Sequence, residues 1–156
     1  MGYTFTRPIT FEPDYVFATD YTPTGSRDFS YTTTSVDPSK GILKYRFLHT
    51  IKSDIEFRVK AFAFGITMKY FSRIENLDQA IFDFEDVTTQ SGGSFQPVLY
   101  RDYFYNHNNG NFIFDVRLSY EFLIHHKLAI ISDNVFNRRY SLRPLKAEPM
   151  RSVTLQ

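Results

Sequence analysis

The sequence contains no cysteine and no tryptophan. Without cysteine, a disulfide framework, a thiolate metal site and a cysteine nucleophile are all excluded. The sequence also lacks an excess of one charge, because its 18 Lys and Arg residues nearly balance its 17 Asp and Glu residues. This balance gives no electrostatic basis for a nucleic-acid partner. No apolar run reaches about 18 residues, which excludes a transmembrane helix, so any membrane span must be made by strands.

Motifs of catalysis and of cofactor binding are lacking as well. Neither a Gly-rich phosphate loop nor a nucleophile elbow occurs in the sequence. The adjacent pair His125–His126 would point to opposite faces of a strand and so would form a poor chelate. We therefore expect no enzyme, no cofactor and no metal site.

Phenylalanine and tyrosine, by contrast, are abundant, with 17 and 11 residues. The mean hydropathy is nevertheless mildly polar, so the apolar residues must be interleaved with polar ones. This composition is typical of β structure with one apolar face.

Alternation of apolar and polar residues is clearest over residues 43–59. A strand places successive side chains on opposite faces, so a period of two predicts strands and not helices. A fourth run alternates poorly, and the fifth is expected to be truncated. The five predicted strands are 43–59, 62–72, 110–122, 127–136 and 150–156.

The connections between these strands alternate between short and long. Tight turns follow the first and third strands, whereas 1–42, 73–109 and 137–149 are long. This alternation is expected of an outer-membrane barrel with short periplasmic turns and long extracellular loops. The sequence therefore predicts an all-β fold, a fragment of an antiparallel transmembrane β-barrel with about five or six strands. The alternative is a soluble antiparallel sheet with one wet face.

In the barrel interpretation, one face of the second and third strands contacts lipid. Tyr45, Tyr70, Tyr120 and Phe122 fall near strand ends, where aromatic girdles lie. The residues predicted to face lipid are Phe62, Phe64, Ile66, Met68, Tyr70, Phe112, Phe114, Val116, Leu118, Tyr120 and Phe122.

One helix is predicted within the long middle loop. Ser72 and Glu75 have the spacing of a capping box. Ile74, Leu77, Ile81 and Phe84 then recur at near-helical spacing. These two features predict a short helix that begins near Ser72.

The stretch Asp133–Tyr140, DNVFNRRY, resembles the (D)N-(L/V)-F-(N/D)-x-x-Y segment of TonB-dependent outer-membrane receptors, most closely those of the Bacteroidetes type. Residues 141–144 and 148–152 are similar to the loop in which Pro and Arg lead into the last strand of that family. The motif residues to which the resemblance assigns a structural role are Asn134, Phe136, Asn137, Tyr140, Pro149 and Arg151.

The resemblance implies the C-terminal part of a barrel of about 22 strands, located in the cell outer membrane. Such receptors take up iron chelates, cobalamin, oligosaccharides or peptides. The implied partners are outer-membrane lipid, a small-molecule or oligosaccharide substrate, and the TonB complex, which acts through a plug that this chain lacks. A rival hypothesis is a soluble or surface-exposed β-rich binding or adhesion module with long variable loops.

If a substrate binds, loop aromatics and arginines are the candidates. Aromatic faces suit sugars and aryl chelates, and arginine suits carboxylate or phosphate groups. The alternative is that these side chains order the loops or contact lipopolysaccharide. The candidates are Tyr100, Arg101, Tyr103, Tyr105, Arg138, Arg139, Tyr140 and Arg143.

Overall fold

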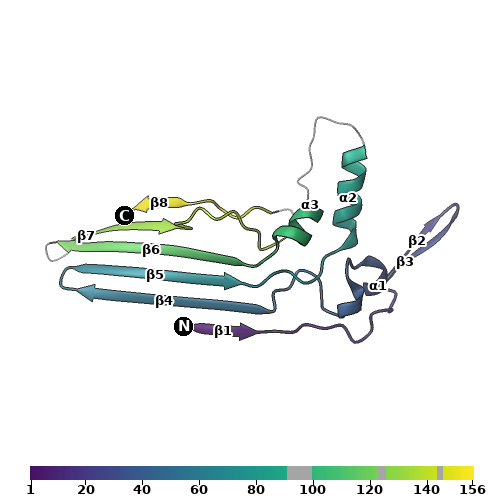
Figure 1. Cartoon of the computed structure of the whole chain (residues 1–156), viewed down its shortest axis with the longest axis horizontal. Helices are drawn as coiled ribbons and strands as arrows, with labels where there is room; N and C mark the ends of the chain where they lie inside the picture. The colour runs from purple at the N-terminus through teal and green to yellow at the C-terminus, as the bar shows by residue number, and fades with distance from the viewer. Residues whose placement is uncertain (91–99, 123–125, 144–145) are drawn as a thin grey trace. The chain divides into compact units, whose positions relative to one another are not determined.

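The computed structural model describes residues 1–90, 100–122, 126–143 and 146–156 (Figure 1). Antiparallel strands dominate these residues and helix is sparse, so the predicted all-β class is confirmed at this level. The chain forms two compact units. Unit 1 comprises Met1–Phe5, His49–Ser72 and Gly110–Gln156, and unit 2 comprises Thr6–Leu48 and Arg73–Asn109.

Unit 1 is one open antiparallel sheet in the order β1-β4-β5-β6-β7-β8. Each strand pairs with the next strand of this unit along the chain, and β1 and β8 form the two edges. The strands are β1 (Gly2–Phe5), β4 (His49–Val59), β5 (Phe62–Phe71), β6 (Asn111–Phe122), β7 (His126–Asp133) and β8 (Ser152–Leu155).

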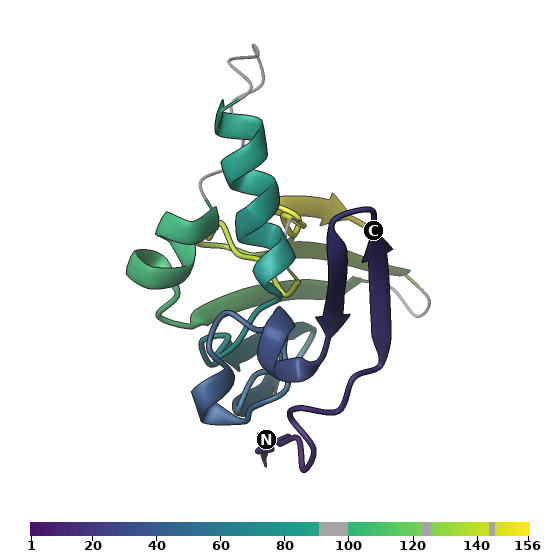
Figure 2. The same cartoon turned by 90° about the vertical axis from the view of Figure 1, so that its right-hand side faces the viewer.

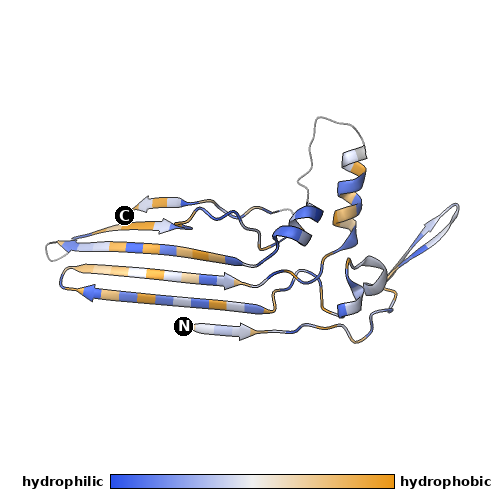
Figure 3. Cartoon of the chain, in the orientation of Figure 1, coloured by the Kyte–Doolittle hydropathy of each residue, from blue (hydrophilic) through white to orange (hydrophobic). Residues whose placement is uncertain are grey.

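The register of the sheet aligns the alternating residues of neighbouring strands. A two-residue turn, in which Lys60 has a φ of 54°, joins β4 to β5. It brings Ile55 opposite Ile66, which in turn lies opposite Val116 of β6. Side chains alternate between the two faces of a strand. Because the apolar residues of neighbouring strands lie directly opposite one another, they fall on one face of the sheet. Figure 3 shows blue and orange bands alternating along β4 and β6, and orange alternating with paler bands along much of β5.

The first predicted strand begins later than the sequence predicts. The strand expected over 43–59 begins only at His49. Tyr45, predicted to join an aromatic girdle, belongs to unit 2, where it has a φ of 62° and its N–H donates to the Asn76 carbonyl at 2.9 Å. Phe47 pairs with Ile74 and packs against the core of unit 2. The alternation over 43–48 therefore reflects separate contacts and not a continuing strand.

One strand of the sheet was not predicted, and two other strands are shorter than predicted. Gly2–Phe5, expected to lie in a loop spanning 1–42, pairs with β4 as β1. The strand expected over 127–136 ends at Asp133, because Asn134 has a φ of 49°, which extended backbone does not allow. The last strand is limited to Ser152–Leu155.

Unit 2 has its own apolar core, made by Ile74, Leu77, Phe82 and Tyr100. Leu77 is fully buried. Figure 2 shows the hairpin β2–β3 of this unit in dark purple and α2 in teal. Its elements are β2 (Ala18–Thr22), β3 (Gly25–Phe29), α1 (Tyr31–Thr34), η1 (Pro38–Lys40), α2 (Gln79–Gln90), α3 (Tyr100–Asp102) and η2 (Tyr103–His107).

Helix α2 begins later than the capping-box pattern predicts. Ser72 does not cap it, because its hydroxyl accepts the His49 N–H at 3.1 Å. Asp78 accepts the N–H of Ala80 at 3.2 Å instead, so the carboxylate satisfies a free donor of the first turn. Among the described residues, no helix is long and apolar enough to cross a membrane.

Candidate functional site

One face of the sheet in unit 1, which we call the apolar face, collects alternate residues from all six strands. The residues of β5 and β6 predicted to face lipid all lie on it, whereas their contact with lipid stays a prediction. The face is not covered, since Phe62 is 55% exposed and Ile130 is 44% exposed. Its apolar members are Tyr3, Phe5, Ile51, Ile55, Phe57, Val59, Phe62, Phe64, Ile66, Met68, Tyr70, Phe112, Phe114, Val116, Leu118, Tyr120, Phe122, Leu128, Ile130, Val153 and Leu155.

Aromatic rings gather at both ends of the apolar face. Near the turns, Phe62 stacks on Tyr120 with ring centroids 4.6 Å apart, and Tyr120 stacks on Phe122 at 6.0 Å. At the other end of the same strands, Tyr70 and Phe112 lie 4.4 Å apart. Aliphatic side chains fill most of the middle. The face therefore has an apolar centre bounded by two aromatic rows.

The opposite face of the sheet, the polar face, carries ion pairs. Arg117 Nη2 lies 2.9 Å from Asp54 Oδ1, and the Thr67 hydroxyl donates to the same carboxylate at 2.8 Å. Gly65 makes room for the guanidinium, because a Cβ there would lie 2.9 Å from Arg117 Nε. The two faces thus differ sharply in chemistry.

At the end of β7, Asn134 forms hydrogen bonds to Arg138 and Pro149 that we call the clasp. This residue is 3% exposed, and its side-chain oxygen accepts a hydrogen bond from the Arg138 N–H at 2.8 Å. The amide Nδ2 donates to the Arg138 carbonyl at 2.8 Å and to the Pro149 carbonyl at 3.3 Å. The Asn134 N–H donates to Asp115, which forms an ion pair of 2.7 Å with Lys69. The clasp thereby joins both ends of the loop 138–149 to the polar face.

The other motif residues surround this clasp. Asn137, with a φ of 51°, accepts the Arg151 N–H at 3.0 Å. Phe136 packs edge-on against Phe114 with centroids 5.3 Å apart. Burial, and next the Glu148 carboxylate, raise the pKa of the Tyr140 phenol above its usual value. The contacts of Asn134 and Asn137 therefore hold the two ends of the loop that precedes β8.

The predicted ligand residues divide between the two units. In unit 2, Tyr100 is buried, and burial raises its pKa to about 12. Arg101 pairs with Asp86 at 2.8 Å and lies over the Phe82 ring, 5.0 Å from its centroid. Tyr103 packs against the core. Of the four in this unit, Tyr105 is the most available to a ligand, being 64% exposed.

The four candidates in unit 1 belong to the loop after β7. Arg138, Arg139 and Arg143 are exposed, whereas Tyr140 is partly buried. Pro144, part of the resemblance, lies outside the described residues. The exposed arginine side chains are accessible to an anion, but they share no hydrogen-bond or ion-pair partner among the described residues.

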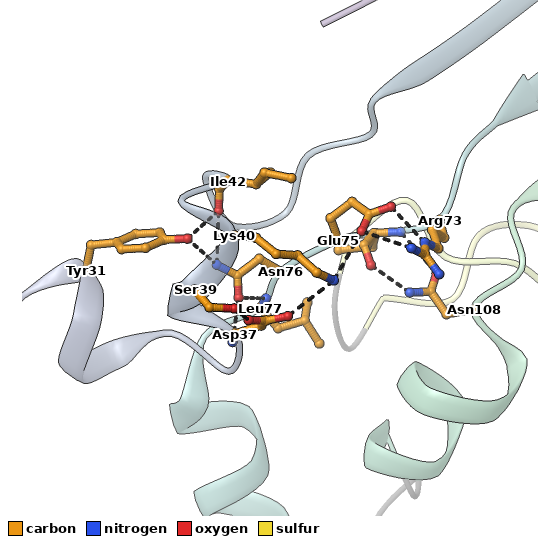
Figure 4. Close-up of polar contacts among 11 residues, drawn as sticks. Tyr31, Asp37, Ser39, Lys40, Ile42, Arg73, Glu75, Asn76, Leu77 and Asn108 are labelled. Carbon is orange, nitrogen blue, oxygen red and sulfur yellow. Dashed lines mark hydrogen bonds and ion pairs between the residues drawn. The ribbon is translucent and has the colours of Figure 1, made fainter. Parts of the chain in front are cut away.

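A buried polar network that the sequence did not reveal organises unit 2 (Figure 4). Asn76 is fully buried, and its Nδ2 donates to the Tyr31 hydroxyl at 2.8 Å and to the Ile42 carbonyl at 3.0 Å. Its Oδ1 accepts the N–H of Asp37 at 3.1 Å. A single asparagine between apolar residues carries no periodic signal, so only the contacts identify it.

Beside this network, Glu75 forms ion pairs with Arg73 at 2.7 Å and with Lys40 at 3.3 Å (Figure 4). Burial alone would raise the pKa of Glu75, but the hydrogen bonds and charges of Arg73 and Lys40 outweigh it and hold the pKa below its usual value. A lowered folded-state pKa stabilises the fold fully above the unfolded value of about 4.3. This contribution is lost as the pH falls through the folded value.

We therefore expect the wild-type chain to lose more stability than Glu75→Gln as the pH falls from about 6 to about 3. Urea unfolding of both proteins at each pH, followed by circular dichroism, measures the difference. Equal losses would contradict the role of Glu75.

Among the described residues, no three His, Cys, Asp or Glu side chains form a group that could hold a metal ion. Acidic residues of α2 have separate partners, since Glu85 accepts a hydrogen bond from the Arg101 N–H and Asp83 accepts one from the Gln79 side-chain amide. Comparisons with protein-family models, with curated proteins and with solved structures found no match for the chain.

Proposed function

We propose that unit 1 forms part of the wall of an outer-membrane β-barrel of the TonB-dependent receptor type. Its apolar face then contacts lipid and its polar face contacts water. The receptor takes up a scarce nutrient such as an iron chelate, cobalamin, an oligosaccharide or a peptide. The observation that carries this proposal is the uncovered apolar face bounded by an aromatic row at each end.

The lengths of the central strands support the proposal. A transmembrane strand tilted by about 45° needs about 9–11 residues, and β4, β5 and β6 have 11, 10 and 12 residues. Girdles of aromatic residues flank the apolar band of outer-membrane barrels. The positions of Phe62 and Tyr120 at one end, and of Tyr70 and Phe112 at the other, fit this arrangement.

Spin labels at single cysteines test the proposal directly. Because the sequence has no cysteine, each substitution gives one label. In lipid vesicles, we expect labels at Val116→Cys and Leu118→Cys to be accessible to oxygen, which concentrates in hydrocarbon. A label at Ser119→Cys, on the polar face of the same strand, should instead be accessible to a water-soluble nickel chelate.

Two outcomes would contradict the proposal. Equal access of the nickel chelate to all three labels would mean that both faces meet water. Labels at 116 and 118 protected from both reagents would mean that protein covers the apolar face. The second outcome would favour the rival hypothesis of a β-rich binding module, in which a second sheet packs on this face.

A further inference from the structure

The polar face of the sheet contains a cavity of about 350 Å³ towards the turn ends of the strands. Ala63, Ser119 and Ala129 form its floor, because they are direct neighbours on β5, β6 and β7. Longer side chains stand on either side of this row. Arg117 lies on one side and Lys127 on the other.

The charged groups that line this cavity differ in the ion pairs that they form. Glu56 pairs with Arg58 at 2.7 Å, and Arg117 Nη2 pairs with Asp54 at 2.9 Å and lies 3.9 Å from Glu56. Lys127, by contrast, forms no ion pair within 4.0 Å in the described part of the chain, although its charge interacts with Glu56 and Glu121 is its cross-strand neighbour. Arg117 uses one of its nitrogens for Asp54, and a guanidinium has five N–H donors. The cavity therefore offers one ammonium without a direct ion pair, the guanidinium donors of Arg117 other than Nη2, and the Ser119 hydroxyl.

We propose that this cavity binds the anionic group of a small ligand, a carboxylate or a phosphate. Lys127 supplies the charge, Arg117 supplies directed N–H donors, and Ser119 supplies a third donor. Charge-assisted hydrogen bonds of this kind are the strong ones. The volume lies near the lower limit of ligand pockets, which span about 300–1,000 Å³, so the bound group is small. This site does not depend on what covers the apolar face.

The test titrates the full chain in detergent micelles with inorganic phosphate and, separately, with citrate, and follows amide chemical shifts by NMR. We expect saturable shifts at Ser119, Lys127 and Ala129 with at least one probe. The probe that saturates identifies the group as phosphate or carboxylate. In Lys127→Gln, which keeps the length of the side chain roughly similar but removes its charge, the affinity should fall about tenfold.

Two further variants make the test specific. Lys52→Gln removes the same charge from the same face outside the cavity, and it should leave the affinity unchanged. Ala129→Leu fills the cavity without altering any charge, and it should abolish binding while the remaining spectrum stays that of the folded sheet. No saturable shift with either probe would overturn the proposal. So would an equal loss of affinity in Lys127→Gln and Lys52→Gln, because binding would then follow net charge alone.

Discussion

Replacing Val116 by arginine is expected to lower the free energy of unfolding of the lipid-inserted chain by about 2–4 kcal/mol. Val116 lies midway along β6, between Phe112 of one aromatic row and Tyr120 of the other, and it faces Ile66 on the apolar face. In the proposed barrel, an arginine at this depth cannot reach water easily from either end of the strand. Urea titration of vesicle-inserted protein, followed by circular dichroism, measures the loss.

Ser119→Arg is the matched control for this prediction. Ser119 is in the same strand, only three residues away, but on the polar face. A charge exposed to water there should change the free energy of unfolding by no more than about 1 kcal/mol. If Val116→Arg and Ser119→Arg cost the same, the apolar face does not contact hydrocarbon and the barrel interpretation fails.

The division of the sheet into two faces was predictable from the sequence for a simple reason. In β5 and β6 apolar residues recur at every second position without a break, and a slip of one position would exchange the two faces. The register that places Ile66 against Val116 therefore agrees with the pattern. The ion pair between Asp54 and Arg117 follows from the same register. It could not be predicted from the sequence, because these residues are 63 positions apart.

Other features could not be predicted because tertiary contacts override the local pattern. Residues 43–48 continue the alternation of β4, yet Phe47 packs in the core of unit 2. Ser72 and Glu75 match a capping box, yet their side chains bond to His49 and to Arg73. In both cases the local signal is real, but a contact with a distant segment competes with it.

The candidate site shows the same division. The motif around Asn134 was identified by resemblance, and the contacts explain its chemistry. The expectation that Tyr100 and Arg101 are available to a ligand did not anticipate their packing, since Tyr100 is buried and Arg101 is paired with Asp86. Aromatic and arginine side chains suit both ligand binding and packing, so composition alone cannot separate the two roles.

Replacing Asn134 by alanine is expected to lower the free energy of unfolding of unit 1 by about 3 kcal/mol. The change removes three side-chain hydrogen bonds, two to the backbone of Arg138 and one to the carbonyl of Pro149. It also places an alanine at a φ of 49°. An L-residue with this φ and no stabilising side-chain hydrogen bond is strained. Urea unfolding measures the total loss.

Asn134→Gly separates the two causes of this loss. Glycine adopts a positive φ without strain but makes no side-chain hydrogen bonds, so it should be more stable than Asn134→Ala by about 1 kcal/mol. Both variants should release the loop 138–149, and trypsin should then cut faster after Arg138 and Arg139. Unchanged cleavage in both variants would mean that other contacts hold this loop. If the Asn134 side chain holds the loop, trypsin should cleave both variants faster, and Asn134→Gly should be more stable than Asn134→Ala. The loop then depends on the hydrogen bonds from Asn134 to Arg138 and Pro149, and not on the backbone angle alone.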